Sequence, residues 1–507
     1  MGRRLESDGK NEKEEILGRE GRFDFFPSHC ELLSVRFKLT NFLGFFFGVT
    51  LFGCVAVSPE SRMGDANAPE VWAASKEAQA GVDRVWVKKM GGSELEGLVD
   101  SALANNEDLK AAAARVDRAT AEAKIAGANR LPSIGLDGSG QRNKQNFIGF
   151  PFGDGGTLSN TVEQFGVSLG AAWELDVWGR AKAGKEAELA NQQARQHELE
   201  AAQVSLAAQV TKAWLALGEA NEQIALAEYA VQASGILADA VRERFERAIA
   251  EAGGTASQVR LTEVERTTRI AALAQRKQER ERVLRQLEIL LGKYPSGSLV
   301  AAAQLPKFPG VTPAGLPSEL LQRRPDILAA ERMLAASGRR VKMRKLARFP
   351  SISLTASTGT NSQSIRDILS SDALVWGLGG GLTQPIFEGG RIGNEIEAAE
   401  ATQREQAAML RKTVLNAFGE VEQALLAETY LAEREAALRE AANIANEAAE
   451  RSNEEYSSGI GDVLTVIEAT KRNIDSASQL ALIRHVRLEN RVNLHLALGG
   501  DFRAARK

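Results

Sequence analysis

Proline is absent from two long runs of this 507-residue chain, and cysteine and histidine are scarce, which argues against helix breaks in those runs, a disulfide framework and a metal site. The runs 180–248 and 391–507 contain no proline, so nothing in them prevents long, uninterrupted helices. Both cysteines, Cys30 and Cys54, lie near the N-terminus, which argues against a disulfide framework and a cysteine metal site. The four histidines are His29, His197, His485 and His495. None belongs to a ligand-spaced cluster, so we expect no metal centre.

An excess of charge of one sign is also lacking. The chain has 63 Lys and Arg residues against 66 Asp and Glu residues, a formal net charge of -3. This balance gives no argument for a nucleic-acid partner. No hydrophobic run beyond residue 60 predicts a transmembrane helix. No nucleophile or carboxylate pair occurs in a pattern typical of an enzyme active site. We therefore expect neither an enzyme nor a bound cofactor.

One stretch changes its hydrophobic period abruptly. Residues 163–173 alternate apolar with small or polar side chains, which predicts a β-strand with one apolar face. From Leu199 to Ala248, apolar residues step by fours and threes, which is a heptad seam. We predict a helix over 178–248, on the order of 100 Å long, and a return helix over 256–291.

The same order of elements returns in the second half of the chain. Residues 129–136 and 347–354 share the pattern x-Arg-x-Pro-Ser-Ile-x-Leu. Each half also ends on Leu-Gly, at 291–292 and 498–499. These matches predict an internal duplication.

The predicted boundaries follow from this duplication. Repeat 1 covers 93–291, with a first helix to residue 129 and strands at about 131–141 and 163–173. A proline-rich linker, 292–316, leads to repeat 2 at 317–499. Within repeat 2 we predict strands at about 350–359 and 374–383, a long helix over 391–456 and a return helix over 461–498, before the tail 500–507.

The N-terminus has the features of an export signal. Residues 1–53 combine a polar extension with a basic and then an apolar, Phe-rich stretch, which is typical of a signal peptide. Leu51-Phe52-Gly53-Cys54 resembles the lipobox of bacterial lipoproteins, in which the cysteine becomes residue one and carries lipid. The resemblance implies a lipid such as palmitate on Cys54 and a surface tether over 54–92. A signal peptide or anchor without lipid is the alternative.

Three short sequence motifs, which we call words, resemble motifs of one known family. The first, residues 316–327, contains Leu316, Pro317, Arg323, Arg324, Pro325 and Asp326. The other two are the strand-to-helix junctions, 173–180 and 384–391, which contain Trp178, Gly179, Arg180, Gly390 and Arg391. Over residues 71–498 the chain resembles the outer-membrane efflux protein family of TolC-like channels, in its lipoprotein branch that serves RND-type pumps.

The resemblance implies a mainly α-helical chain with a membrane β-barrel portion. Three chains would share a twelve-stranded β-barrel, continued across the periplasm by an α-helical barrel. From the residues alone, the strands fit a soluble sheet with one buried face equally well. Four strands cannot close a membrane barrel, which takes about eight or more. A spanning sheet must therefore be shared between several chains.

The resemblance also implies a passive exit duct in the outer membrane of a Gram-negative bacterium. Its partners would be a periplasmic adaptor (membrane fusion) protein and an RND-type inner-membrane pump. Its cargo would be drugs or other small molecules. Two alternatives remain open, a type I protein-secretion channel and a periplasmic coiled-coil scaffold.

The family closes its channel at the helix turns farthest from the barrel. Here these turns lie near 250–257 and 457–463, and the acids Asp462 and Glu251 are the gate candidates, because a ring of acids favours cations. Alternatively, each acid caps the helix that follows it. The family's aromatic-x-x-Gly word is kept at Tyr456 and lost in the first repeat, so we expect the two tips to differ.

Overall fold

The computed structural model describes most of both predicted repeats. The described residues are 72–74, 86–147, 158–248, 255–301, 304–310, 315 and 317–500. All of them belong to one compact unit, residues 63–507. Three residues singled out from the sequence, Cys54, Glu251 and Leu316, lie outside the described residues.

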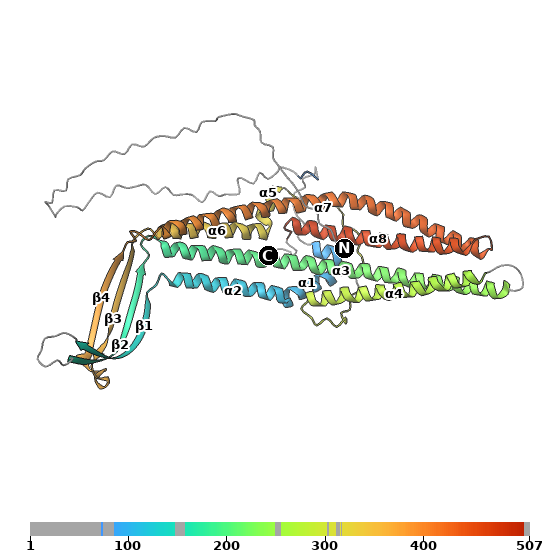
Figure 1. Cartoon of the computed structure of the whole chain (residues 1–507). Coiled ribbons are helices and arrows are strands. Elements are labelled where there is room, and N and C mark those ends of the chain that lie inside the picture. Colours follow the sequence, from blue (N-terminus) through green and yellow to red (C-terminus); the bar gives the residue numbers. More distant parts are fainter. Residues whose placement is uncertain are drawn as a thin grey trace, which may run out of the picture. The chain divides into compact units, whose positions relative to one another are not determined.

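Two copies of one arrangement make up the described chain (Figure 1). The first copy consists of α1 (Trp86–Asn105), α2 (Glu107–Ala128), β1 (Ser133–Phe147), β2 (Leu158–Leu175), α3 (Arg180–Ala248) and α4 (Ala256–Leu290). The second consists of α5 (Pro317–Arg323), α6 (Pro325–Leu346), β3 (Ser351–Ser362), β4 (Leu374–Thr383), α7 (Arg391–Ser457) and α8 (Val463–Ala497). Each copy has two shorter helices, two strands, a long helix and a return helix, in that order.

The four strands form one antiparallel sheet in the order β1-β2-β3-β4. The two central strands come from different repeats, and their pairing runs from Leu175 opposite Ile352 to Phe165 opposite Ser362. The sheet extends from the end of the helices at which α3 and α7 begin (Figure 1). It therefore joins the two repeats directly through backbone hydrogen bonds.

The first two strands are longer than the sequence predicts. The alternation predicts 131–141 and 163–173, whereas β1 spans Ser133–Phe147 and β2 spans Leu158–Leu175. Most of the added length is polar on both faces, so hydrophobic periodicity does not reveal it. The backbone nevertheless continues to pair, as far as Phe147 opposite Leu158.

The predicted single helix over 93–129 is wrong in its boundaries. α1 already begins at Trp86 and is kinked at Gly92, whose φ is 65°. Asn106 then ends the first helical run, because its backbone is extended and its side chain accepts a hydrogen bond from the Leu109 N–H at 3.1 Å. This asparagine is the N-cap of α2, a role that its side-chain oxygen favours.

Buried side chains of α3 follow the predicted seam. Those at most 9% exposed include Leu206, Val210, Leu217, Ala220, Ala227, Ala238 and Val241. They pack α3 against α1, α2, α4, α6 and α8. By length and composition α3 is apolar enough to cross a membrane, so our expectation that no helix beyond residue 60 has this character is wrong.

Two hydrophobic clusters hold the helices together. One joins α1, α3, α4 and α8 and contains Trp86, Leu215, Leu287 and Val492. The other joins α5, α6, α7 and α8 and contains Leu320, Ile327, Val421 and Leu498. Because α8 contributes to both clusters, it packs on the first repeat as well as on its own.

A single tryptophan of the predicted tether is buried in the second cluster. Trp72 is 2% exposed and meets Phe418 edge-on, with 6.1 Å between the ring centroids. Its Nε1 donates a hydrogen bond to the Gly315 carbonyl at 3.0 Å. A lone tryptophan shows no periodicity, so the sequence gives no sign of this docking.

The residues after Trp72 are fixed as well. The N–H groups of Ala73 and Ala74 donate to the two carboxylate oxygens of Glu422, at 2.7 and 2.9 Å. The prediction of a surface tether over 54–92 is therefore wrong at residues 72–74, and again from Trp86, where α1 begins.

A buried carboxylate holds the start of the linker on α4. Glu288 is 2% exposed and accepts hydrogen bonds from the N–H groups of Gly297 and Leu299 at 2.7 and 3.0 Å. Burial alone would raise the pKa of Glu288, but these bonds, with those from Ser298 and the Ser296 hydroxyl, lower it below its ordinary value. The ionised carboxylate therefore stabilises the linker loop.

We predict that Glu288→Gln destabilises the protein at neutral pH by about 1–3 kcal/mol, because an amide has one acceptor oxygen where the carboxylate has two. Folding lowers the pKa of Glu288, so its contribution is present above the unfolded-state pKa of about 4.3. It is lost as the pH falls through the folded value. Thermal unfolding of both proteins as a function of pH measures the difference.

The control for this prediction is Glu279→Gln on the same helix. Glu279 pairs with Arg282 at 2.6 Å on the surface, and such a pair contributes at most about 1 kcal/mol. Equal destabilisation by the two substitutions would contradict the role of burial at Glu288.

Candidate functional site

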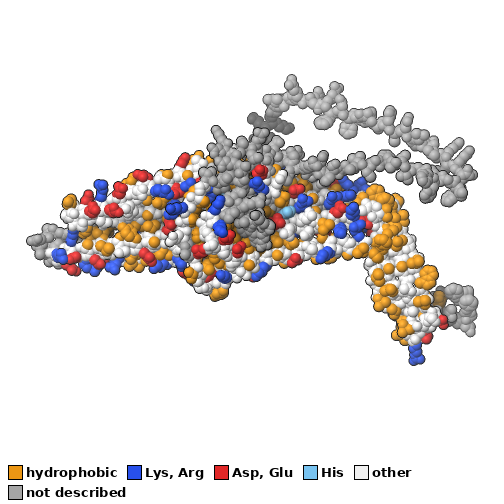
Figure 2. All heavy atoms as spheres, turned by 180° about the vertical axis from the view of Figure 1, so that it is seen from behind, with side chains coloured by type: hydrophobic (Ala, Val, Ile, Leu, Met, Phe, Trp, Pro, Cys, Tyr) orange, Lys and Arg blue, Asp and Glu red, His pale blue; other side chains and the backbone are white. Residues whose placement is uncertain are grey.

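One face of the sheet is apolar and exposed, and we call it the apolar face. Trp173 lies opposite Leu354, and Leu354 opposite Gly380, so alternate residues of neighbouring strands share this face. Its exposed members include Ile134, Leu136, Val167, Leu169, Trp173, Leu354, Trp376, Leu378 and Leu382. Figure 2 shows hydrophobic side chains over the sheet. A face of this extent is unfavourable in water and favourable in lipid.

The opposite face of the sheet, the polar face, carries small and hydroxyl side chains. Its members include Ser133, Asp137, Ser139, Ser168, Ser351, Ser353, Thr355, Ser357, Gly377, Gly379 and Gly381. Some hydroxyls bond across the strands, as Thr355 does to the Gly379 carbonyl at 3.5 Å. Such side chains leave space for water, as in the interior of a membrane channel.

The sheet has two uncovered edges within the described chain. β1 pairs only with β2, and β4 pairs only with β3. In lipid, each unpaired backbone N–H or C=O group would cost several kcal/mol. Four strands are also too few to close on themselves. If the apolar face contacts lipid, strands from further chains must cover these edges.

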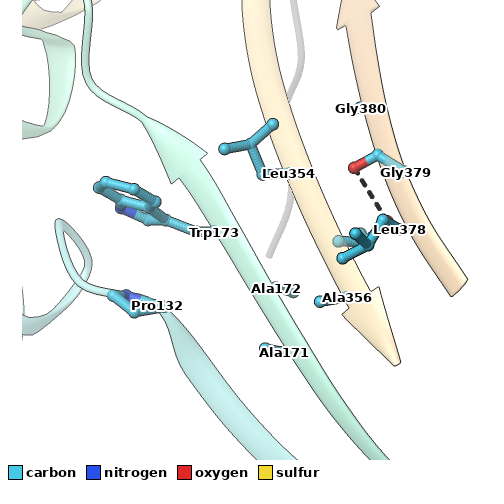
Figure 3. A pocket seen from close by; sticks show the side chains of 10 residues that line it. Pro132, Ala171, Ala172, Trp173, Leu354, Ala356, Leu378, Gly379 and Gly380 are labelled. Atoms are coloured by element: carbon cyan, nitrogen blue, oxygen red, sulfur yellow. Dashed lines mark hydrogen bonds between the residues drawn. The ribbon is translucent and has the colours of Figure 1, made fainter. Parts of the chain in front are cut away.

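The apolar face has a hollow of about 520 Å³ near its helix end (Figure 3). Trp173, Leu354 and Leu378 border the hollow, and the small side chain of Ala356 lies between them. The indole of Trp173 is held in place because its Nε1 donates to the Arg130 carbonyl at 2.9 Å. The hollow is therefore a fixed feature of the lipid-compatible surface.

The two junction words form corners at which a strand gives way to a long helix. Gly179 and Gly390 have φ values of 80° and 85°, a conformation that favours glycine. At the first corner, the carboxylate of Asp176 accepts hydrogen bonds from the N–H groups of Ala181 and Lys182, at 2.9 and 2.7 Å. These bonds cap α3 at its first turn.

Trp178 connects the first corner to the start of the second repeat's sheet. Its ring stacks on Phe349, with 5.2 Å between the ring centroids, and its Nε1 donates to the Pro350 carbonyl at 2.7 Å. Phe349 and Pro350 stand directly before β3. The first junction word is thus packed on the start of the second repeat's sheet.

The arginines of the junction words form local ion pairs. Arg180 pairs with Glu174 at 2.6 Å, across the first corner. Arg391 pairs with Glu388 and with Glu395, the latter at 2.6 Å. Both arginines therefore have structural partners, and neither faces a catalytic group.

The signature of the second repeat begins two helices with proline. Pro317 begins α5 and Pro325 begins α6, positions at which the missing N–H has no intrahelical partner to lose. Arg323, the last residue of α5, forms a partly exposed salt bridge with Glu319 one turn earlier, at 2.8 Å. It therefore contributes little to the packing of the repeats.

Its neighbour Arg324 is 8% exposed and joins three helices. Its Nε and Nη2 donate to the carboxylate of Asp326 at 3.0 and 2.7 Å, while Nη1 donates to Glu420 at 2.6 Å and to the Ala497 carbonyl at 3.0 Å. Burial alone would lower the pKa of Arg324, but the two carboxylates raise it above its ordinary value. Arg324 therefore remains charged and links α6 to α7 and α8.

The two predicted gate acids have different outcomes. Asp462 is the N-cap of α8, and its side chain accepts a hydrogen bond from the Leu464 N–H at 3.1 Å. This is the capping role that the sequence left open as the alternative. Glu251 lies outside the described residues.

Sequence reasoning missed a contact between the helix tips, which we call the tip contact. The guanidinium of Arg244, near the end of α3, lies 4.1 Å from the ring centroid of Tyr456, near the end of α7. Arg244 Nη2 also donates to the Tyr456 carbonyl at 2.6 Å. The aromatic-x-x-Gly word marks Tyr456, but no local pattern marks a partner 212 residues away.

A groove of about 550 Å³ lies between the two helical hairpins beside the tip contact. Its lining comes from all four helices and includes Ile236, Arg269, Tyr456 and Ile467. The hairpins are therefore separated along part of their length, so the tip contact is one of few direct bridges in this region.

A second missed cluster fixes the linker between the repeats. The ring of Phe308 lies between the guanidinium groups of Arg487 and Arg491, at 3.7 and 4.6 Å from its centroid. Arg487 also forms salt bridges with Glu428 at 3.0 Å and Glu435 at 2.8 Å. The linker is thus attached to α8, through an arginine that also pairs with α7.

Comparisons with known proteins agree with this geometry. The family model described as "Outer membrane efflux protein" matches residues 98–293 and 316–500. The chain is similar to outer membrane protein OprJ of Pseudomonas aeruginosa, with 31% identity over 89% of this chain and 94% of that protein. It is also similar to the pyoverdine export outer membrane protein OpmQ of the same species, with 30% identity over 90% and 96%.

Among solved structures, the outer-membrane channel OprN has a similar fold. The TM-score is 0.78 at 26% identity, and the match covers 88% of this chain and 99% of OprN.

We predict that Arg324→Lys destabilises the protein more than Arg323→Lys. A lysine lacks the planar fork, so Asp326, Glu420 and the Ala497 carbonyl cannot all keep a charged donor, at a cost of about 1–3 kcal/mol. At the exposed Arg323–Glu319 pair we expect less than about 1 kcal/mol. Thermal unfolding midpoints in detergent compare the two adjacent substitutions. Equal midpoints would show that the buried network is not what stabilises this signature.

Proposed function

This chain belongs to the outer membrane efflux protein family, and from that membership we propose that three copies form a passive exit duct for small molecules. The protein is an outer-membrane channel of an efflux system in a Gram-negative bacterium. Members of this family are transporters, and channels of this kind form trimers that work with an adaptor and an inner-membrane pump.

The observation that carries the proposal is the sheet with two chemically different faces and two uncovered edges. Its strands span 10 to 18 residues, enough to cross the hydrocarbon core, which takes about 9–11. Three copies supply twelve strands, a number within the range of known membrane barrels. The edge strand β4 of one copy would pair with β1 of the next. The apolar face would then meet lipid and the polar face would line the lumen.

The helices would continue the duct into the periplasm. α3 and α7 have 69 and 67 residues, so each is on the order of 100 Å long. We infer that the pump is of the RND type and that a periplasmic adaptor meets the helices. The relative OpmQ is named for the export of pyoverdine. In this family the pump chooses the cargo, and we propose the same here.

We place the gate at the helix tips, where the tip contact joins the two hairpins of one chain. At a partly exposed site, an arginine over an aromatic ring contributes about 0.5–1 kcal/mol and a hydrogen bond about 0.5–1.5 kcal/mol net, together about 1–2 kcal/mol. Opening that separates the hairpins would break both interactions. Asp462 and Glu251 remain our candidates for acids that line the pore there and favour cations.

We also propose that Cys54 carries lipid after cleavage of the signal peptide. The support is the lipobox-like sequence before it. Trp72, eighteen residues later, is docked on the body of the protein. The segment from Cys54 to Trp72 would therefore connect the lipid to that body.

The function is tested by expressing the chain with its own signal in a Gram-negative host, together with Cys54→Ala, in the presence of radioactive palmitate. We expect both proteins to form an unheated oligomer near three times the monomer mass, and only the wild type to be labelled and recovered in the outer membrane in full yield. An unlabelled wild-type trimer would remove the lipid from the proposal and keep the channel. A soluble periplasmic protein would overturn the channel.

The gate is tested by Arg244→Ala in planar bilayers. In a trimer of this variant all three tip contacts are lost, so the closed-to-open ratio should fall about 10²- to 10⁴-fold, since each contact contributes about 1–2 kcal/mol and about 1.4 kcal/mol corresponds to a factor of ten. Tyr456→Ala removes the ring and keeps the carbonyl, so its effect should be intermediate. The control is Arg247→Ala, because Arg247 pairs only with Glu243 on its own helix among the described residues. Equal effects of Arg244→Ala and Arg247→Ala would exclude the tip contact from gating.

A further inference from the structure

Both basic residues in the last turn of α6 form salt bridges, whereas Arg348, just after the helix, does not among the described residues. Arg344 forms a salt bridge with Glu395 at 3.2 Å, and Lys345 with Glu400 at 2.8 Å. Arg348, two residues before Pro350 and β3, is exposed and has no salt-bridge partner within the described part of the chain. The pKa of the nearby Glu400 is lowered mainly by the hydrogen bond from Lys345 and also by the charge of Arg348. Among the described residues the Arg348 guanidinium donates no hydrogen bond, so its donors are available to an anion outside the chain.

Arg348 lines a pocket of about 250 Å³ together with the junction before α7. In this pocket Ile386 and Phe387 are 90% and 87% exposed, which is high for such large apolar side chains. The backbone of Arg348 is held next to this junction because Gln384 Nε2 donates to its carbonyl at 3.0 Å. A positive charge and two exposed apolar side chains thus share one pocket.

The charge in this pocket is net positive. Its charged side chains are Arg348, Arg391 and Glu388, two cations against one anion. Arg391 is engaged by Glu395 and Glu388, which raise its pKa above the ordinary value, so the hydrogen-bond donors that no carboxylate engages in this pocket are those of Arg348. A guanidinium binds a phosphate, as it does a carboxylate, through two parallel hydrogen bonds.

The hollow on the apolar face begins a short distance along the same strands. Leu354, at its border, is six residues after Arg348, so at about 3.3 Å per residue the two are at most about 20 Å apart. One leaflet of a bilayer, with its headgroups, is also about 20 Å thick. One lipid molecule is therefore long enough to have its headgroup at the pocket and its chain in the hollow.

We infer that the pocket and the hollow form one site for an anionic phospholipid of the periplasmic leaflet. Arg348 binds the phosphate, Ile386 and Phe387 enter the headgroup boundary, and an acyl chain lies between Trp173 and Leu378. Aromatic and basic side chains have these roles at membrane interfaces generally. The inference rests on the proposed function, because that function places the apolar face in lipid and the helices in the periplasm.

Native mass spectrometry of the detergent-solubilised full-length protein, titrated with phosphatidylglycerol or phosphatidylcholine, tests the site. We expect three tightly bound phosphatidylglycerol molecules per trimer and at least about tenfold weaker binding of phosphatidylcholine, the scale of one charge-assisted hydrogen-bonded contact. Arg348→Gln should reduce phosphatidylglycerol affinity about tenfold and abolish the preference between the lipids.

Gly380→Leu fills the hollow, because a Cβ at Gly380 meets only Leu354 at 3.6 Å and the Ser353 carbonyl at 4.0 Å. It should weaken both lipids alike. The matched controls are Arg366→Gln, an exposed arginine in the β3–β4 connection, and Gly138→Leu, on the apolar face of β1, where a Cβ has no neighbour within 4 Å. Both controls should bind as the wild type does.

Each other outcome overturns the site. Equal binding of the two lipids by the wild type would remove the role of Arg348, and unchanged binding by Gly380→Leu would remove the hollow. Loss of the trimer in Arg348→Gln or Gly380→Leu, with the controls intact, would make this surface a contact between protein copies. A wild type that is not a trimeric outer-membrane protein would refute the proposed function. A conducting trimer without retained lipid would refute the site alone.

Discussion

The hydrogen-bonding needs of the peptide backbone in lipid determine how this protein is built. A sheet with one apolar face gains from entering a membrane, but its edge strands cannot leave their N–H and C=O groups unpaired there. One chain provides β1 and β4 as uncovered edges, so the smallest membrane-compatible object contains several chains. The duplication follows the same need: each repeat supplies only two strands, and the pairing of β2 with β3 joins them into a wider sheet.

The strand-to-helix corners transmit this arrangement to the helices. Positive φ values at Gly179 and Gly390 allow the chain to turn from a strand into a long helix within a few residues at each corner. The stacking of Trp178 on Phe349 then packs the corner of one repeat on the start of the other's sheet. Because each long helix begins at a corner where a strand ends, the number of strands around a common axis determines the number of long helices around it.

Periodic features could be predicted from the sequence, and contacts between distant segments could not. The alternation at 163–173 and the seam of α3 indicate a strand and a helix because period alone separates the two. The polar end of β1 has no hydrophobic periodicity, so the sequence does not indicate that the strand continues there. Arg323 and Arg324 are adjacent arginines, so the sequence alone does not distinguish their roles. Arg324 has three partners because it is buried. The partner of Tyr456 and the burial of Trp72 likewise depend on packing between segments far apart in the sequence.

The tip contact makes the two hairpins of one chain unequal partners. Its arginine belongs to the first hairpin and its tyrosine to the second, so a trimer would have three joined pairs of hairpins around its axis. If each contact contributes about 1–2 kcal/mol, three of them together contribute about 3–6 kcal/mol to a concerted closure. That corresponds to a closed-to-open ratio of about 10² to 10⁴. Threefold repetition would thus turn a weak surface interaction into a cooperative seal against leakage.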